Sequence, residues 1–211
     1  AITNGKADGI EKDNFFGKTV KLMADLDLGG VKAADGTWSG QMWYPIGQGF
    51  IRAFAGTFQG NGHKISNLYI DGSKDDERNT DLGLFGNIDE DGMVKSVSVV
   101  SGQITSTHQD SPDVAGIAGT NKGVIFGCHN GADITAPQFA AGIAADNHGT
   151  IAQCSNSGTI TRTAVDRDYA GGICASTRGR YVINCYNTGS IVLTSGKYST
   201  ATGGVVGAIA T

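Results

Sequence analysis

Short apolar runs recur along this chain every 26 to 31 residues, and none of them has helical periodicity. The clearest copies span residues 115–134, 141–160 and 171–191, each with a small-residue Gly-Ile motif, an Asn and a closing Ile. An apolar pair three residues apart extends the pattern backwards, as Ile65/Leu68, Val94/Val97, Ile125/Cys128, Ile151/Cys154 and Val182/Cys185. This period, with Asn-x-Gly turns between alternating runs, predicts coils of short strands.

Stacked coils form a parallel β-solenoid, because one coil alone cannot bury its inward row of side chains. From Lys18 onwards about six coils of three strands fit the chain. We therefore expect an N-terminal lead-in or cap remnant at residues 1–17 and a β-helix domain at residues 18–211. An uncovered last coil would leave strand edges open, so we expect the domain to continue beyond residue 211 in the parent protein.

The spacing of each apolar pair carries further information. Residues i and i+3 of a flat strand face opposite sides, so a bend between them is expected to turn both inward. The Asn at positions 130, 156 and 187 is expected to stack and to bond to corner backbone. A glycine column is expected, one glycine per coil, at Gly56, Gly83, Gly116, Gly142, Gly172 and Gly204.

Composition narrows the possible functions. The 211 residues include 33 glycines, and 16 basic against 20 acidic residues give a net charge of −4, which argues against a nucleic-acid partner. No apolar run is long enough for a membrane span, so membrane insertion by this segment is not expected. The four cysteines leave three interpretations open: buried free thiols, a disulfide or a metal site. Three of them, Cys128, Cys154 and Cys185, share the repeat position of Leu68 and Val97, which favours free thiols.

Several motifs together resemble a known family. They are the lead-in at residues 17–28, Trp-Tyr-Pro-Ile-Gly at 43–47, the stretch at 54–70, and Gly-Leu-Phe-Gly at 83–86 before the Gly-Gly-Ile and Cys-x-Asn-x-Gly coils. This combination resembles bacterial surface proteins that carry the GLUG motif. The resemblance implies a right-handed parallel β-helix, export, and an extracellular or cell-surface location. Some members precede the catalytic domain of zinc metallopeptidases that cleave immunoglobulin A, but His-Glu-x-x-His is absent here, so no catalytic residue carries over.

Insertions between coils offer the first candidate site. The segments 71–81, 105–113, 135–140, 162–169 and 194–202 are all expected on one edge of the rod, where solenoids often bind ligands. They carry the candidates Asp75, Asp76, Arg78, Asp110, Asp113, Asp166, Arg167, Tyr169 and Tyr198. These side chains fit solvated charges that protect a sheet edge, a calcium site or a contact with a glycan or protein.

A second candidate is the aromatic patch of Trp38, Trp43 and Tyr44, whose rings could stack on sugars. Packing of Trp43 against the first coil or its cap is the favoured alternative for that residue.

Two functional hypotheses follow from these sequence features. The first is a non-catalytic surface module, adhesin-like or a spacer, whose partners would be host glycans or host or bacterial surface proteins, with no cofactor expected. The second is a polysaccharide lyase or hydrolase, which would need a groove with two carboxyl groups about 5–9 Å apart.

Overall fold

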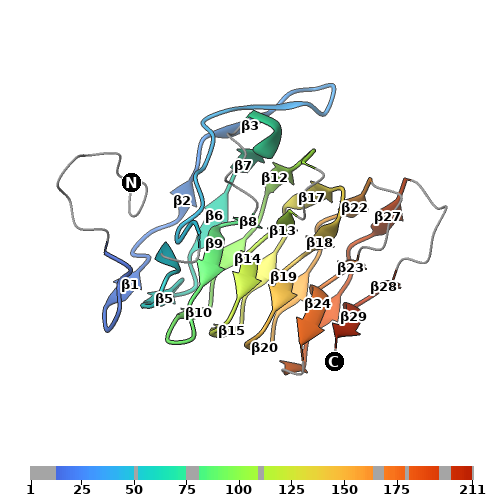
Figure 1. Ribbon diagram of the computed structural model, residues 1–211. Helices are drawn as coiled ribbons and strands as arrows, with labels where there is room; N and C mark the ends of the chain where they lie inside the picture. The colour runs from blue at the N-terminus through green and yellow to red at the C-terminus, as the bar shows by residue number, and fades with distance from the viewer. Residues whose placement is uncertain are drawn as a thin grey trace.

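The chain folds into a parallel β-helix in which each coil stacks on the one before it. The computed structural model describes residues 13–49, 52–74, 81–108, 112–163, 169–178, 181–194 and 201–210. Figure 1 shows the coils side by side, from the blue N-terminal end to the red C-terminal end. Each complete coil passes through five sheets in turn, whereas the described part of the first coil contributes strands only to sheets 1 and 2. All strand pairs within these five sheets are parallel. The expected β-helix is confirmed.

Sheets 1 and 2 each contain six strands. Sheet 1 consists of β1 (Thr19–Lys21), β5 (Thr57–Gln59), β10 (Met93–Lys95), β15 (Val124–Phe126), β20 (Thr150–Ala152) and β25 (Val182–Ile183). Sheet 2 consists of β2 (Leu26–Asp27), β6 (Lys64–Ser66), β11 (Ser98–Val99), β16 (His129–Asn130), β21 (Ser155–Asn156) and β26 (Tyr186–Asn187).

Sheets 3, 4 and 5 contain five strands each. Sheet 3 consists of β7 (Leu68–Asp71), β12 (Gly102–Thr105), β17 (Asp133–Ala136), β22 (Ile160–Arg162) and β27 (Ile191–Leu193). Sheet 4 consists of β8 (Asp81–Leu82), β13 (Asp113–Ala115), β18 (Phe139–Ala141), β23 (Tyr169–Gly171) and β28 (Ala201–Gly203). Sheet 5 consists of β9 (Phe85–Ile88), β14 (Ala118–Asn121), β19 (Ala144–Asn147), β24 (Cys174–Arg178) and β29 (Val206–Ala210).

Two further elements leave the stack. An antiparallel hairpin of β3 (Gly30–Lys32) and β4 (Trp38–Gly40) projects from the N-terminal end, and a short 3₁₀ helix, η2 (Gly72–Lys74), follows β7. The described residues include no helix long and apolar enough to cross a membrane.

The expected bends are present at the corner between sheets 1 and 2. The residue between each apolar pair has a left-handed backbone: Ser96, Gly127, Gln153 and Asn184 have φ between 52° and 61°. A further corner, between sheets 4 and 5, contains a glycine such as Gly116. With these corners each complete coil is divided into five strand segments. The expected division into three strands was therefore too coarse.

One part of the predicted register is wrong. Phe58, not Ile65, stacks beneath Val94, while Ile65 pairs with Val99 and Leu68 with Gly102. The first complete coil has a longer turn at this corner, where Asn61 and Gly62 both have positive φ, and this turn shifts the sequence pattern. Cys128 therefore shares its column with Val97 but not with Leu68.

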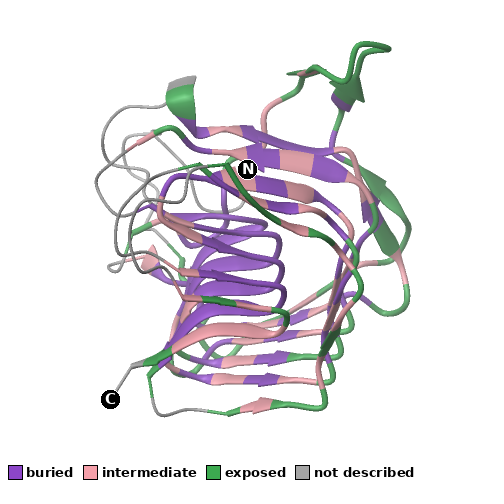
Figure 2. Ribbon diagram, turned by 90° about the vertical axis from the view of Figure 1, so that its right-hand side faces the viewer, coloured by how far each residue is buried: buried purple, intermediate pink, exposed green. Residues whose placement is uncertain are grey.

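The core is a continuous apolar column inside the coils, visible as the purple strand faces in Figure 2. Val94, Ile125 and Ile151 stack in successive coils, each with no exposed surface. Fully burying one such side chain stabilises the fold by about 1.5–3 kcal/mol. At the N-terminal end Phe15 packs on Phe54, with ring centroids 5.9 Å apart.

Asparagine side chains form the expected ladder along one corner of this core. Asn130 Nδ2 donates to Asn156 Oδ1 at 2.8 Å, and Asn156 Nδ2 donates to Asn187 Oδ1 at 2.8 Å. Asn130 Nδ2 also donates to the Ala132 carbonyl at 2.9 Å, and the other two bond to backbone in the same way. A second ladder joins Asn121 Nδ2 to Asn147 Oδ1 at 2.7 Å. Buried amides are thus paired along the axis.

The glycine column is present with one exception. A Cβ added to Gly142 would lie 2.3 Å from the Gly172 carbonyl oxygen and 2.5 Å from Asn156 Cγ, so the asparagine ladder leaves room only for glycine. Gly56 does not belong to this column. Its carbonyl accepts from Met93 N at 2.8 Å, which places it at the corner before sheet 1.

Candidate functional site

In each complete coil the chain passes from a strand of sheet 3 to a strand of sheet 4, so the candidate segments begin and end at one edge of the stack. Asp75, Asp76, Arg78, Asp110, Asp166, Arg167 and Tyr198 lie outside the described residues, and their roles stay predictions. The other two candidates, Asp113 and Tyr169, each begin a strand of sheet 4.

Tyr169 is part of a small packed cluster and is not a projecting loop side chain. Its ring packs edge-on against Phe139, with centroids 5.5 Å apart. Both rings lie against the fully buried methyl groups of four alanines, at positions 115, 141, 145 and 175. This packing fixes the Tyr169 ring between sheets 4 and 5, and its role in ligand binding stays a prediction.

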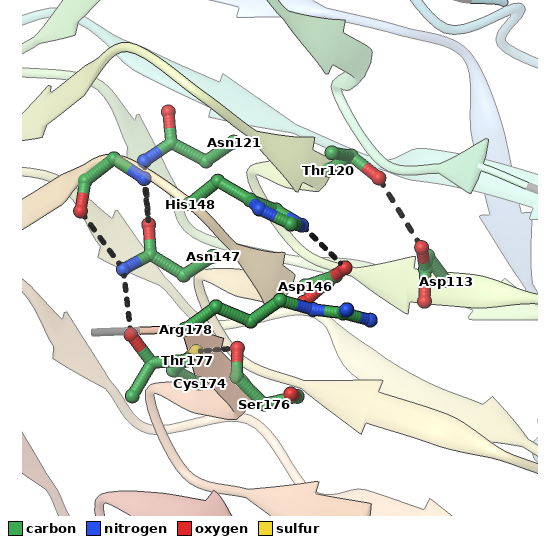
Figure 3. Close-up of polar contacts among 11 residues, drawn as sticks. Asp113, Thr120, Asn121, Asp146, Asn147, His148, Cys174, Ser176, Thr177 and Arg178 are labelled. Carbon is green, nitrogen blue, oxygen red and sulfur yellow. Dashed lines mark hydrogen bonds and ion pairs between the residues drawn. The ribbon is translucent and has the colours of Figure 1, made fainter. Parts of the chain in front are cut away.

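Asp113 stacks on Asp81 of the preceding coil, so two carboxyl groups lie side by side. Asp81 Oδ2 accepts from Asn87 Nδ2 at 2.7 Å. Asp113 Oδ2 accepts from Thr120 Oγ1 at 3.2 Å, as Figure 3 shows. Burial and the nearby carboxylates of Asp81 and Asp146 raise the pKa of Asp113 to about 8. Burial and the Asp146 carboxylate also raise the pKa of Asp81. At neutral pH the Asp113 carboxyl group is therefore mostly protonated.

Asp146 continues this acidic group towards the corner between sheets 5 and 1. In Figure 3 it lies between His148 and Arg178, with Asp146 Oδ2 2.8 Å from His148 Nε2 and Oδ1 3.6 Å from Arg178 Nε. A shallow groove of about 620 Å³ beside this corner also includes Glu90 and Lys122. Acidic and basic groups alternate here, so the corner presents no strong charge of one sign.

No group of three or more His, Cys, Asp or Glu residues in the described segments is arranged to hold a metal ion. A calcium site on the loop carboxylates falls on residues that lie mostly outside those segments.

The cysteines are free thiols. Cys128, Cys154 and Cys185 stack in successive coils, and the sulfurs of the last two lie beside the preceding coil: Cys128 N donates to Cys154 Sγ at 3.4 Å and Cys154 N to Cys185 Sγ at 3.4 Å. The bond with Cys128 and burial hold the pKa of Cys154 at about 12, and burial raises the pKa of Cys174. Cys154 and Cys174 are therefore poor nucleophiles. The bond with Cys154 lowers the pKa of Cys128, which is nevertheless buried as a small apolar residue.

The three aromatic residues of the predicted patch have different surroundings. Trp43 is packed against the core, and its Nε1 donates to the Leu84 carbonyl at 3.1 Å, as the packing alternative expected. Tyr44 is 48% exposed. Trp38 is half-buried in the hairpin, where Lys32 Nζ lies 6.0 Å from its ring centroid.

Trp38 forms one wall of a groove of about 500 Å³ between the hairpin and sheet 3. The hairpin turn contributes Asp35 to this groove, and sheet 3 contributes Tyr69, Asp71, Gln103 and Thr105. The last four form a two-by-two array on adjacent coils, because Tyr69 pairs with Gln103 and Asp71 pairs with Thr105. Residues two apart on a strand share a face, so all four point away from the core, where Ile70 and Ile104 lie.

Both carboxylates of this groove, termed the hairpin groove, are fixed as hydrogen-bond acceptors. Asp35 Oδ1 accepts from Thr37 N at 2.9 Å and from Thr37 Oγ1 at 2.7 Å, and these bonds lower the pKa of Asp35. Asp71 Oδ1 accepts from Ser73 N at 3.2 Å, and the Tyr69 hydroxyl lies 3.4 Å from Asp71 Oδ2. The Tyr69 ring, only 5% exposed, is the floor of the groove.

Sequence analysis identified Trp38 as a candidate but missed the polar residues that surround it. Tyr69 and Gln103 are 34 positions apart, and neither belongs to a recognisable motif. Only the register between coils could have placed them side by side, and the predicted register was wrong in this coil.

Comparison with known proteins identifies similar chains. No family model matches this sequence. Half of the chain is 33% identical over 108 residues to halomucin from Haloquadratum walsbyi, covering 1% of that protein. Half is also 34% identical over 106 residues to a candidate Gly-rich membrane protein from Evansella cellulosilytica, covering 11% of it. The chain thus spans a small part of these relatives.

The crystal structure of a candidate immunoglobulin A1 protease from Bacteroides ovatus has the same fold. It matches with a TM-score of 0.72 at 21% identity, over 92% of this chain and 56% of that one. At this identity the similarity shows a shared β-helix fold and carries no information on activity. The neighbour agrees with the resemblance to GLUG-motif proteins, some of which precede the catalytic domain of such peptidases.

Proposed function

We propose that this chain is a non-catalytic module of a cell-surface or secreted protein, with an adhesin-like binding role. The observation that carries the proposal is the hairpin groove, which presents an aromatic ring and several polar groups on a rigid sheet. The floor strands β7 and β12 pair in parallel, and Ile70 and Ile104, between the floor residues, are buried in the core, which fixes the positions of the floor residues. A pre-formed site of this kind suits binding, because little ordering is needed when a ligand arrives.

The surface location draws support from the relatives. Halomucin and the candidate Gly-rich membrane protein have names that indicate surface or membrane proteins, and the structural neighbour is a candidate immunoglobulin A1 protease. A stacked β-helix would serve in such proteins as a stiff spacer that holds its binding surface away from the cell.

The state of Asp35 in the hairpin groove argues against the enzyme alternative. Glycoside hydrolysis uses one carboxyl group that is protonated near neutral pH and donates to the leaving oxygen. Asp35 is instead held ionised by Thr37. The carboxyl groups with raised pKa, Asp81 and Asp113, both lie on sheet 4 and do not line the hairpin groove.

Two measurements test this proposal. Antibodies against the chain should label intact cells of the source organism as strongly as permeabilised ones; labelling that requires permeabilisation would contradict a surface location. Incubation of the protein with a panel of polysaccharides and with immunoglobulin A should give no new products by chromatography and gel electrophoresis. Turnover of any of them would contradict the non-catalytic role.

A further inference from the structure

The hairpin groove combines features that together select one class of ligand. Its wall is the half-buried ring of Trp38, and its floor joins the Tyr69 ring to the side chains of Gln103 and Thr105. Sugar rings have an apolar face of C–H groups, which packs on aromatic rings, and a rim of hydroxyl groups, which donate and accept hydrogen bonds. The Trp38 ring can pack on the apolar face of a sugar. The Gln103 amide and the Thr105 hydroxyl can form hydrogen bonds with the sugar hydroxyl groups.

Charge narrows the class further. Among the described residues, the lining of the groove contains two carboxylates, Asp35 and Asp71, and no Lys or Arg. Lys32 lies beside the lining, with its Nζ 6.0 Å from the Trp38 ring centroid. Asp35 remains ionised because Thr37 donates two hydrogen bonds to it. Carboxylates accept bonds from sugar hydroxyl or ammonium groups, but they repel the carboxylates of uronic and sialic acids. The site therefore favours sugars without acidic groups.

The geometry of the floor indicates an extended ligand. Tyr69 and Asp71 lie on one coil and Gln103 and Thr105 on the next, about 4.8 Å along the axis. Polar groups at this repeat can contact consecutive units of a chain. The next coil continues the column beyond the groove with Asp133, which pairs with Gln103, and with Thr135, which pairs with Thr105.

We propose that the hairpin groove binds non-acidic oligosaccharides, with Trp38 stacking on a sugar ring and Gln103, Thr105, Asp35 and Asp71 bonding to its hydroxyl groups. This inference rests on the proposed function in one respect, since it assumes binding without turnover. It adds the position of the site, the ligand class and the residues that select it.

The test begins with the complete 211-residue protein on an array of neutral, amino and acidic oligosaccharides. Titration calorimetry then follows with cellohexaose, chitosan hexamer and hexagalacturonic acid. We expect binding of neutral or amino sugars and none of hexagalacturonic acid. Absence of binding to any non-acidic glycan, or preference for the acidic ones, would overturn the proposal, as would saturation of the groove by a cationic peptide in place of sugars.

Variants locate the site. Trp38→Ala should weaken binding about tenfold or more, and Gln103→Ala about fivefold, because a stacking face and a bonding amide are lost. Tyr44→Ala is the matched control: it removes an exposed aromatic ring from the same N-terminal region without touching the groove. Equal effects of Trp38→Ala and Tyr44→Ala would overturn the assignment. Circular dichroism checks folding, and Gln103→Ala keeps the test decisive if Trp38→Ala unfolds the hairpin.

A charge variant tests selectivity. Asp35→Asn retains a side-chain oxygen for the Thr37 bonds but removes the charge, so hexagalacturonic acid should bind more tightly than to the wild type. No change in its binding would contradict the electrostatic selection. If sugars bind in the groove and are also cleaved, the non-catalytic role fails while the site stands. If no sugar binds and none is cleaved, the site fails while the non-catalytic role stands.

Discussion

Asn130 Nδ2 donates a hydrogen bond of 2.8 Å to Asn156 Oδ1 on the next coil. Both side chains are fully buried, so this bond lies in surroundings without competing water. A buried amide that loses its partner incurs the full cost of desolvation. The ladder therefore fixes the relative position of the coils.

Replacement of Asn156 by Ala should lower the free energy of unfolding by about 2–4 kcal/mol. It removes the partners of Asn130 and Asn187 together with the bond to the Gly158 carbonyl. Urea denaturation followed by circular dichroism gives the value. Ser157→Ala is the control: it removes only contacts of an exposed hydroxyl, at 3.3 Å from His129 Nε2 and 3.5 Å from the Asn130 carbonyl, and should change stability little. A loss for Asn156→Ala no larger than for this control would show that the ladder does not stabilise the stack.

The glycine column offers a second comparison, between two of its own members. Gly142→Ala should destabilise the fold by about 2–3 kcal/mol, because its Cβ would overlap the Gly172 carbonyl and the Asn156 side chain. Gly204→Ala should be tolerated, since no atom lies within 4 Å of the Cβ it would add. Melting temperatures of the two variants measure the difference, and similar values would contradict the steric explanation.

Stability should depend on pH through Asp113. Its pKa is about 8 in the folded protein and about 3.9 when unfolded, so the folded state binds more protons between these values. The free energy of unfolding should therefore fall as pH rises from about 4 to about 8, by a few kcal/mol at most. Urea titrations at pH 5 and pH 8 measure the slope. Asp113→Asn keeps an acceptor for Thr120 and should flatten this slope; an unchanged slope in the variant would assign the effect elsewhere.

The cysteines should react slowly with alkylating reagents in the native protein. Cys128, Cys154 and Cys174 are buried, and the pKa values of Cys154 and Cys174 are raised, so the reactive thiolate is scarce. Mass spectrometry after brief iodoacetamide treatment should find these three unmodified at pH 8, and modified once the protein is unfolded in guanidinium. Rapid native labelling of Cys154 would contradict this picture.

The stack itself could be predicted from sequence because its repeat is local and visible. The Ile125/Cys128 and Ile151/Cys154 pairs indicated a bend, and Gly127 and Gln153 supply it with left-handed backbones. The Asn130 row was likewise apparent from its recurrence at a fixed position. Patterns of this kind depend only on which residues are apolar or small.

The register of the first complete coil and the groove could not be predicted in the same way. The turn at Asn61 lengthens that coil, so Ile65 matches the sequence pattern of the column that contains Val94, although Phe58 occupies that column. The groove depends on how the hairpin packs over Tyr69 and on which residue of the next coil pairs with it. Both are long-range consequences of packing, and no local residue pattern determines them.

The core column tolerates coils of unequal length. Val20, Phe58, Val94, Ile125, Ile151 and Val182 stack in register although the chain between neighbours varies from 26 to 38 residues. The additional residues of the longer coils belong to the β3–β4 hairpin or to the segments that connect sheet 3 with sheet 4. Proteins with this architecture can lengthen, shorten or exchange the segments outside the core while the core column stays the same. They can therefore acquire a new binding surface without a change of fold.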